Sequence, residues 1–343
     1  MSDVKTSINK VQVVGTLLEM NLMEETKEVA LKGANGVEKK VTCRSIGKKE
    51  FKNPTFLVEV EKKDEDGNVV STSNVGIDFY SIAEKKLDEH GNIVDNPRFK
   101  SMETVFETYL PKVNCKSDEK PTRVKIDGSL RENGYVDKNT YEWKSFSVVN
   151  GFSITSSSVP EEDIADCEIS GIIRTIIPET KGENAEETGR LKVELWSFDG
   201  LGAITPTTLI VEEDLADAFQ DYYESGQSVK VYYEILSKQI GAKKVTTGGF
   251  GRRESKAVSG YTVTEYSVFR GDDPFEEENE YFITTEKVKE AMDEREIMIA
   301  NKIKDAKENK GANSTPKPSP KGASASAKAN PFGRESSVKK SPF

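Results

Sequence analysis

The sequence has only one histidine among its 343 residues, His90, and three cysteines, Cys43, Cys115 and Cys167. A single histidine cannot form a His-based catalytic triad or a multi-histidine metal site. An odd number of widely spaced cysteines fits reduced thiols better than a disulfide framework or a zinc site. We therefore expect a protein that is not an enzyme and that uses no cofactor and no metal.

Long hydrophobic runs are also missing. No apolar stretch approaches the roughly 20 residues that a membrane-spanning helix needs. Residues 1–10 hold no apolar segment of the kind that a secretory signal requires. We expect a cytoplasmic protein without a membrane partner.

The charge is acidic overall, with a net value of −10, but it is distributed unevenly. Residues 159–283 carry 12 Lys and Arg against 26 Asp and Glu, whereas residues 284–343 carry 13 against 8. An acidic total argues mildly against a nucleic-acid ligand. Local patches matter more, because the field at a groove is set by charges within about 10 Å.

The main positive feature is a five-strand pattern that occurs twice. Each copy opens with a β-branched run that contains a glycine, Gly15 or Gly171, which in a strand suggests a bulge or a sharp bend. The matched segments are 13–18 with 169–173, 56–60 with 191–196, 103–109 with 214–223, 123–130 with 229–236, and 143–151 with 261–271. The order strand, strand, strand, helix, strand, strand is that of the OB-fold, a small barrel that often binds single-stranded nucleic acid or oligosaccharide.

The pattern predicts a mainly β protein with two tandem OB-like β-barrels. We place the first OB-like domain, with its long basic insertion, at residues 1–158, and the second, with an acidic linker at its end, at 159–283. Apolar residues at helical spacing then predict a helix over 284–308. Residues 309–343 hold too little apolar surface to offset their ordering entropy, which predicts a disordered basic tail. Within the first domain, residues 88–92 are typical of a hairpin tip.

Two basic patches with aromatic residues are candidate nucleic-acid sites, because cations beside rings that stack on bases bind single strands with little sequence preference. The first lies in the insertion between the first two strands, and its alternative interpretation is a solvated basic loop. It comprises Lys39, Lys40, Arg44, Lys48, Lys49, Phe51 and Lys52.

The second patch joins the last two strands of the second domain, a position where OB barrels commonly grip ligands. Its glycines allow the chain to wrap a strand, and so basic a loop stands out in a domain this acidic. A solvated hairpin is the less favoured interpretation. The patch comprises Lys238, Lys243, Lys244, Phe250, Arg252, Arg253 and Lys256.

Aromatic residues on the predicted strands form a third group. Alternation puts strand neighbours on opposite faces, so Tyr232 and Tyr233 cannot both point inward. Core packing is the better interpretation for any single ring, but two or three should lie on a binding face if the domains bind single strands. We include Trp143 among the binding candidates. The group is Tyr80, Tyr135, Tyr141, Trp143, Phe146, Trp196, Phe198, Tyr232, Tyr233, Tyr261 and Tyr266.

Taken together, the tandem barrels, the basic aromatic loops and the tail that ends in Pro342 and Phe343 resemble single-stranded DNA-binding proteins of bacteria and bacteriophages. The resemblance is closest to phage-type members with two barrels in one chain. In the bacterial proteins an acidic tip closing with Pro-Phe recruits replication and repair enzymes, whereas the residues before Pro342 here are basic.

The resemblance implies protection of single-stranded DNA in phage replication, recombination or repair, in the host cytoplasm. It also implies that Pro342 and Phe343 dock a replication or recombination enzyme. Two alternatives remain open, a phage tail or baseplate protein and an accessory subunit of a replication enzyme.

Overall fold

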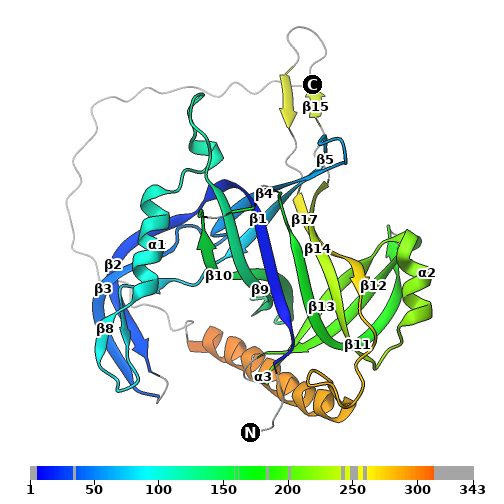
Figure 1. Ribbon diagram of the computed structural model, residues 1–343. Helices are drawn as coiled ribbons and strands as arrows, with labels where there is room; N and C mark the ends of the chain where they lie inside the picture. Colours follow the sequence, from blue (N-terminus) through cyan, green and yellow to red (C-terminus); the bar gives the residue numbers. More distant parts are fainter. Residues whose placement is uncertain are drawn as a thin grey trace, which may run out of the picture.

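The computed structural model describes residues 6–33, 36–157, 159–160, 162–182, 185–199, 202–240, 244–247, 254–257 and 261–312. Within these, the side chains of 238–240, 244–247, 254–257, 261–262 and 309–312 are not described. The architecture is mainly β with a long C-terminal helix, as the sequence predicted (Figure 1).

The first five-strand unit closes on itself and is called the first ring below. Its strands are β1 (Asn9–Met20), β4 (Phe56–Lys63), β5 (Val69–Asp78), β9 (Arg123–Val136) and β10 (Trp143–Thr155). β1 pairs with β4, β4 with β5, β5 with β10, β10 with β9, and β9 again with β1; only β5 and β10 run parallel. Helix α1 (Pro97–Thr108) lies between β5 and β9 in the chain.

The second ring repeats this connectivity. It consists of β11 (Asp166–Lys181), β12 (Glu186–Phe198), β13 (Ile204–Val211), β14 (Ser228–Ile240) and β17 (Tyr261–Gly271), with α2 (Glu213–Tyr222) between β13 and β14. β13 and β17 form the parallel pair, and β14 closes the ring onto β11. The order in both rings is the one that the repeated sequence pattern indicated.

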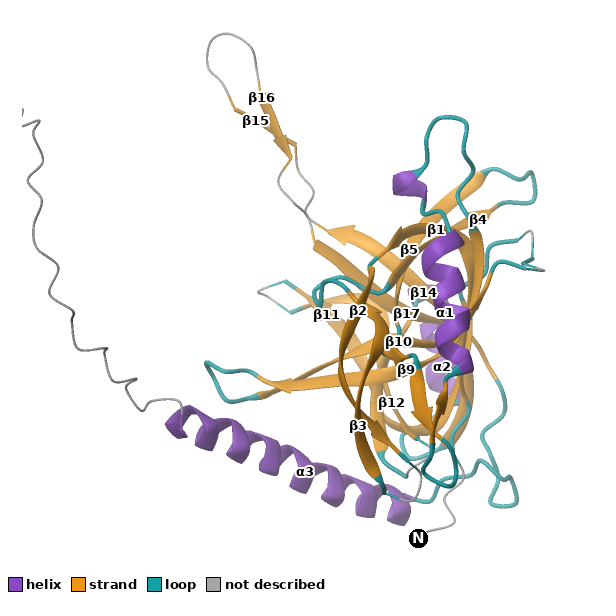
Figure 2. Cartoon of the chain, turned by 90° about the vertical axis from the view of Figure 1, so that its left-hand side faces the viewer, coloured by secondary structure: helices purple, strands orange, loops and turns teal. Residues whose placement is uncertain are grey.

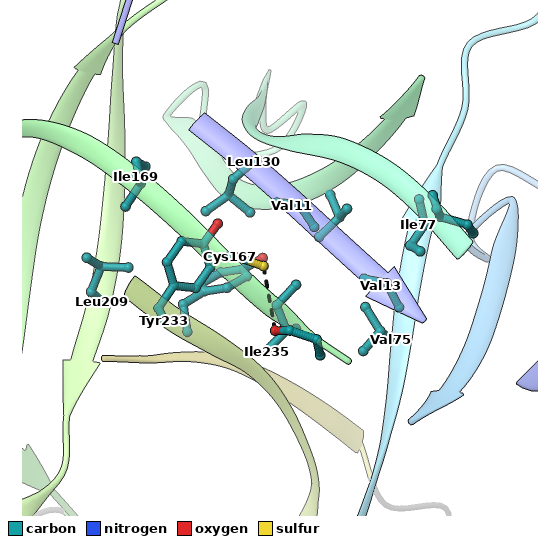
Figure 3. Close-up of a cluster of buried hydrophobic side chains, with 14 of the residues drawn as sticks. Val11, Val13, Val75, Ile77, Leu130, Cys167, Ile169, Leu209, Tyr233 and Ile235 are labelled. Atoms are coloured by element: carbon teal, nitrogen blue, oxygen red, sulfur yellow. Dashed lines mark hydrogen bonds between the residues drawn. The ribbon is translucent and has the colours of Figure 1, made fainter. Parts of the chain in front are cut away.

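The rings are joined edge to edge. β1 pairs antiparallel with β11 through Asn9–Ile169, Lys10–Glu168 and Val11–Cys167, so one sheet runs through both rings. A single hydrophobic core also spans the junction, with side chains from both rings in contact (Figure 3). Cys167 lies within it, and burial raises the pKa of its thiol to about 12.

A glycine lies at the bend in the first strand of each ring, Gly15 in β1 and Gly171 in β11. The bend lets each strand pair with two neighbours within its own ring. A Cβ at Gly15 would lie 2.2 Å from the carbonyl oxygen of Glu59, and one at Gly171 would lie 2.4 Å from that of Trp196. Each strand has its register shift just beyond, after Leu17 and after Ile173. The bend that the sequence suggested is therefore confirmed at equivalent places in both rings.

The predicted basic insertion of the first ring is itself folded. It forms a hairpin of β2 (Leu22–Lys32) and β3 (Glu38–Lys48), extended by β6 (Ile82–Ala83). A second hairpin, β7 (Lys85–Leu87) and β8 (Ile93–Asp95), turns at residues 88–92, where the Asp88 carboxylate accepts a 2.7 Å hydrogen bond from the amide of Asn92. The predicted hairpin tip is thus confirmed. The short η1 (Lys112–Asn114) and the pair β15 (Lys244–Thr247) and β16 (Glu254–Ala257) complete the elements before α3.

Helix α3 (Thr285–Ala312) begins at the capping residue Thr284, whose hydroxyl accepts from the amide of Lys287. It extends four residues beyond the predicted end and runs beneath both rings before projecting outward (Figures 1 and 2). Its first turns pack Val288, Ala291 and Met292 against Trp196 and Phe198 of the second ring. The predicted tail after Ala312 lies outside the described residues.

Candidate nucleic-acid interface

The turn between β3 and β4 presents the most exposed ring of the first patch. Phe51 is 91% exposed there, between the exposed Lys49 and Lys52. Asn21 holds the turn: its side-chain amide donates to the carbonyl of Glu50 at 2.8 Å and accepts from the amide of Glu50 at 3.0 Å. Because the backbone is fixed by these bonds, the ring is displayed by an ordered support.

A second exposed surface lies on the part of β9 and β10 that extends past the ring, residues 131–136 and 143–148, called the arm below. β1 pairs with β9 only as far as Gly128, so the arm is a two-stranded ribbon with two separate faces. Register places Arg131 opposite Val148, Asn133 opposite Phe146, and Tyr135 opposite Lys144. Since directly opposed residues share a face, these side chains form one outer face.

The outer face combines aromatic rings with cations. Tyr135 and Phe146 are 50% and 51% exposed. Tyr80, 67% exposed, approaches from the end of β5: the guanidinium of Arg131 lies 6.0 Å from its ring centroid and donates to its hydroxyl at 3.4 Å. Rings and cations interleaved in this way provide the two contacts that single-strand binding uses.

Lys144 belongs to this face but is held by the arm's tip. Its ammonium group lies 2.7 Å from the carboxylate of Asp137. That hydrogen bond, with those from the amides of Asn139 and Thr140, lowers the pKa of Asp137 to about 2. The carboxylate is therefore ionised at neutral pH and keeps the tip closed. Arg131 and Lys144 were not singled out from sequence, although their alternation with Tyr135 and Phe146 was a readable signal.

The other cations of the first patch are engaged within the protein. Lys39 donates to the carbonyl of Gly91 at 2.8 Å, Lys40 lies 3.4 Å from Glu28, and Lys48 lies 2.7 Å from Asp78.

Arg44 contacts three carboxylates, at 3.4 Å for Glu24, 3.2 Å for Glu84 and 2.6 Å for Glu103, and its guanidinium lies 5.0 Å from the Phe99 ring centroid. Hydrogen bonds to Glu84 and Glu103 raise its pKa. These contacts fasten the β2–β3 hairpin to α1. The structure thus brings Lys49, Phe51 and Lys52 together at the surface and draws Arg44 into an ion-pair network.

Trp143 lies on the inner face of the arm, the face that packs against α3. Its indole packs on the backbone of Gly134, where an added Cβ would come within 1.9 Å of the ring. The ammonium of Lys302 lies 4.8 Å from its ring centroid. Alternation explains this, because Lys144 and Phe146 take the outer face and Trp143 the inner one.

The second patch is described only in part. Lys238 lies in β14, where it pairs with Val263, and Lys244 and Lys256 lie in β15 and β16. Lys243, Phe250, Arg252 and Arg253 lie outside the described residues, as do Pro342 and Phe343.

Most of the described aromatics of the second ring are buried, Tyr233 and Tyr266 in the ring's core and Trp196 and Phe198 against α3. Tyr232 points to the opposite side from Tyr233, with the guanidinium of Arg270 3.8 Å from its ring centroid. No helix within the described ranges is long and apolar enough to cross a membrane.

A family model named YorF matches residues 7–305, and the chain belongs to this family. No curated protein matches the chain. Among solved structures, the wild-type single-stranded DNA binding protein from Thermus aquaticus is similar at 10% identity and a TM-score of 0.42, covering 80% of this chain and 97% of that one. A deletion mutant of that protein is similar at 12% identity and a TM-score of 0.40, covering 80% and 98%. At such low similarity the likeness carries no functional argument, and function must be inferred from this chain's own surface.

Proposed function

We propose that this protein binds single-stranded DNA with little sequence preference and has no catalytic role. The observation that carries the proposal is Phe51, which stands 91% exposed between two lysines on a turn braced by Asn21. An exposed ring on a rigid support loses little entropy when a base stacks on it, and the flanking ammonium groups can meet the adjacent phosphates.

The outer face of the arm extends this site. The β3–β4 turn and Tyr80 are close in the fold, because the amide of Phe79 donates to the hydroxyl of Thr55 at 3.0 Å. From Tyr80 the surface continues through Arg131 to Tyr135 and Phe146. A single strand following this route meets rings and cations in succession, whereas a stacked duplex offers no unpaired base faces.

The second patch and the tail belong to the same proposal. The loop that holds Phe250, Arg252 and Arg253 would give the second ring its own contact with the strand. Pro342 and Phe343 would dock a replication or recombination enzyme, in the setting of phage DNA replication, recombination or repair in the host cytoplasm. Pull-down with full-length protein and with Phe343 deleted tests docking, since identical partner sets would discard it.

Binding of labelled oligo-dT, followed by fluorescence anisotropy over a salt series, tests the main proposal. We expect much weaker binding to duplex and a log–log salt slope of about −0.7 per phosphate neutralised. Phe51→Ala should weaken binding by roughly 1–3 kcal/mol, the usual contribution of one stacked base. Phe269→Ala is the matched control, because it removes a partly exposed phenylalanine side chain from a strand of the second five-strand unit. Equal affinity for duplex and single strand, or a wild-type affinity for Phe51→Ala, would contradict the proposal.

A further inference from the structure

Helix α3 is held in two different ways along its length. Its first turns are anchored by buried apolar contacts, with Val288 and Ala291 packed in a cluster with Ile172, Trp196 and Ile204. Farther along, Ile299 and Ile303 are only half-buried and Ile297 is 62% exposed. The part of the helix from Arg295 onward can therefore leave its site without opening a core.

From Arg295 onward, α3 covers the inner face of the arm with charged contacts. Arg295 pairs with Glu132, and both side chains are largely buried. About two helical turns farther on, Lys302 lies 4.8 Å from the Trp143 ring centroid. Lys307, more than three turns beyond Arg295, lies 5.9 Å from the ring centroid of Tyr141. The ring of Trp143 in the arm and the ring of Tyr141 in the turn at its tip are thus each capped by a lysine ammonium group.

The covered face shows one sign of a poor fit in the closed arrangement. The indole nitrogen of Trp143 is buried without a hydrogen-bond partner among the described residues. Tyr141 has a φ of 57°, which belongs to the hairpin turn at the tip, where its backbone amide donates to the carbonyl of Asp137 at 2.8 Å. A buried indole N–H that donates to nothing favours any state in which water or a ligand reaches it.

We infer that the inner face of the arm is a second stacking surface for single-stranded nucleic acid, with α3 as its movable cover. Bases would take the places of the two ammonium groups on Trp143 and Tyr141, while Lys302 and Lys307 turn to the phosphates. Stacking of a base on an aromatic ring is stronger than an exposed cation over the same ring, so the strand can displace the lysines. The inference rests on the proposed function, because it assigns a further contact to the same ligand.

The Arg295–Glu132 pair is the latch, and a charge-neutral variant tests it. Glu132→Gln together with Arg295→Gln removes the pair without changing the net charge and without leaving one buried charge alone. If closure limits access, opening raises the competent fraction, and affinity for oligo-dT should rise roughly threefold or more. Lys289→Gln with Glu290→Gln is the matched control, because both side chains are exposed on the anchored part of α3 and the net charge is again unchanged.

A measurement without DNA can detect the opening of α3 independently of ligand binding. With 5-fluorotryptophan at Trp143 and Trp196, two ¹⁹F resonances are expected, and Trp143→Phe assigns them. The latch variant should move the Trp143 resonance toward its solvent-exposed position, as should oligo-dT added to the wild type. Glu132→Asp, which keeps both charges but shortens one side chain, is a milder second variant and should give a smaller shift in the same direction.

The outcomes distinguish the two proposals. Failure of oligo-dT to bind wild type and latch variant alike would overturn the proposed function. If the strand binds but Trp143→Ala costs no affinity in either background, or if the Trp143 resonance responds neither to the latch variants nor to DNA, only the present inference is overturned. Loss of the threefold gain on adding Trp143→Ala would support it.

Discussion

The two rings share one connectivity but differ in how they use their charged and aromatic side chains. In the first ring, Phe51, Tyr135 and Phe146 stand at least half exposed next to cations. In the second, Trp196 and Phe198 are buried and anchor α3. The closed sheet sets only the strand framework. The outward-facing residues determine whether a ring presents exposed aromatic side chains or packs against α3.

Ionic networks make the same contrast. Arg190 of the second ring is only 10% exposed and lies within 3.4 Å of Glu179, Glu212 and Glu265. Arg44 beside the first ring also contacts three carboxylates but is 41% exposed. Water screens the Arg190 network far less than the Arg44 network, so the same number of ion pairs contributes differently to the free energy of unfolding.

Removing these arginines should have the largest effect. Arg190→Gln leaves carboxylates without their cation in a buried site and should lower the free energy of unfolding by about 3 kcal/mol or more. Arg44→Gln should cost much less, because its network is solvated. Urea unfolding of both variants measures the difference, and equal losses would break the comparison between the networks.

The equivalent glycines should behave alike. Gly15→Ala and Gly171→Ala each force a methyl group against a carbonyl oxygen of the neighbouring strand, which should cost roughly 1–3 kcal/mol of stability. Ser71→Ala, at an exposed position of β5, is the control and should leave the melting temperature nearly unchanged. A loss in only one ring would show that the two bends are not equivalent.

Loop substitutions compare the rings as ligand sites. Phe250→Ala with Arg252→Ala and Arg253→Ala should weaken oligo-dT binding by about 1–3 kcal/mol or more, since it removes a ring and two cations. The triple change Lys39→Ala, Lys40→Ala, Lys48→Ala should weaken it less, because these ammonium groups already have partners in the protein. Anisotropy titrations decide, and the reverse order would place the main site on the first ring alone.

The smallest expected effect concerns pH at the arm. The pKa of Asp137 is lowered to about 2 from an ordinary value of 3.8, so the ionised form stabilises the folded tip. This contribution is fully present above about pH 4 and is lost as the pH falls toward 2. In NMR titrations the carboxyl resonance of Asp137 should titrate in that range, and Asp137→Asn should abolish the pH dependence of the Lys144 signal. An Asp137 midpoint near 4 would show that the tip is open.

Local sequence signals were enough to predict the repeated framework. Period-2 alternation, glycine at two equivalent bends and the position of each short helix predicted the strand order of both rings, because these signals depend on local geometry. The sequence also separated Tyr232 from Tyr233, since neighbours on a strand must face opposite sides. The helix after residue 284 followed from apolar spacing in the same way.

Which charges and aromatic side chains are available at the surface depends on long-range packing. The sequence grouped Arg44 with Lys49 and Lys52 as one basic patch, yet Glu84 and Glu103, distant in the chain, neutralise it. The sequence placed Trp143 among the binding candidates and Phe146 only in the wider aromatic group, yet α3 covers the face of the arm that carries Trp143 and leaves Phe146 exposed. Local pattern tells which residues share a face, but which face is covered depends on long-range packing, which local pattern does not encode.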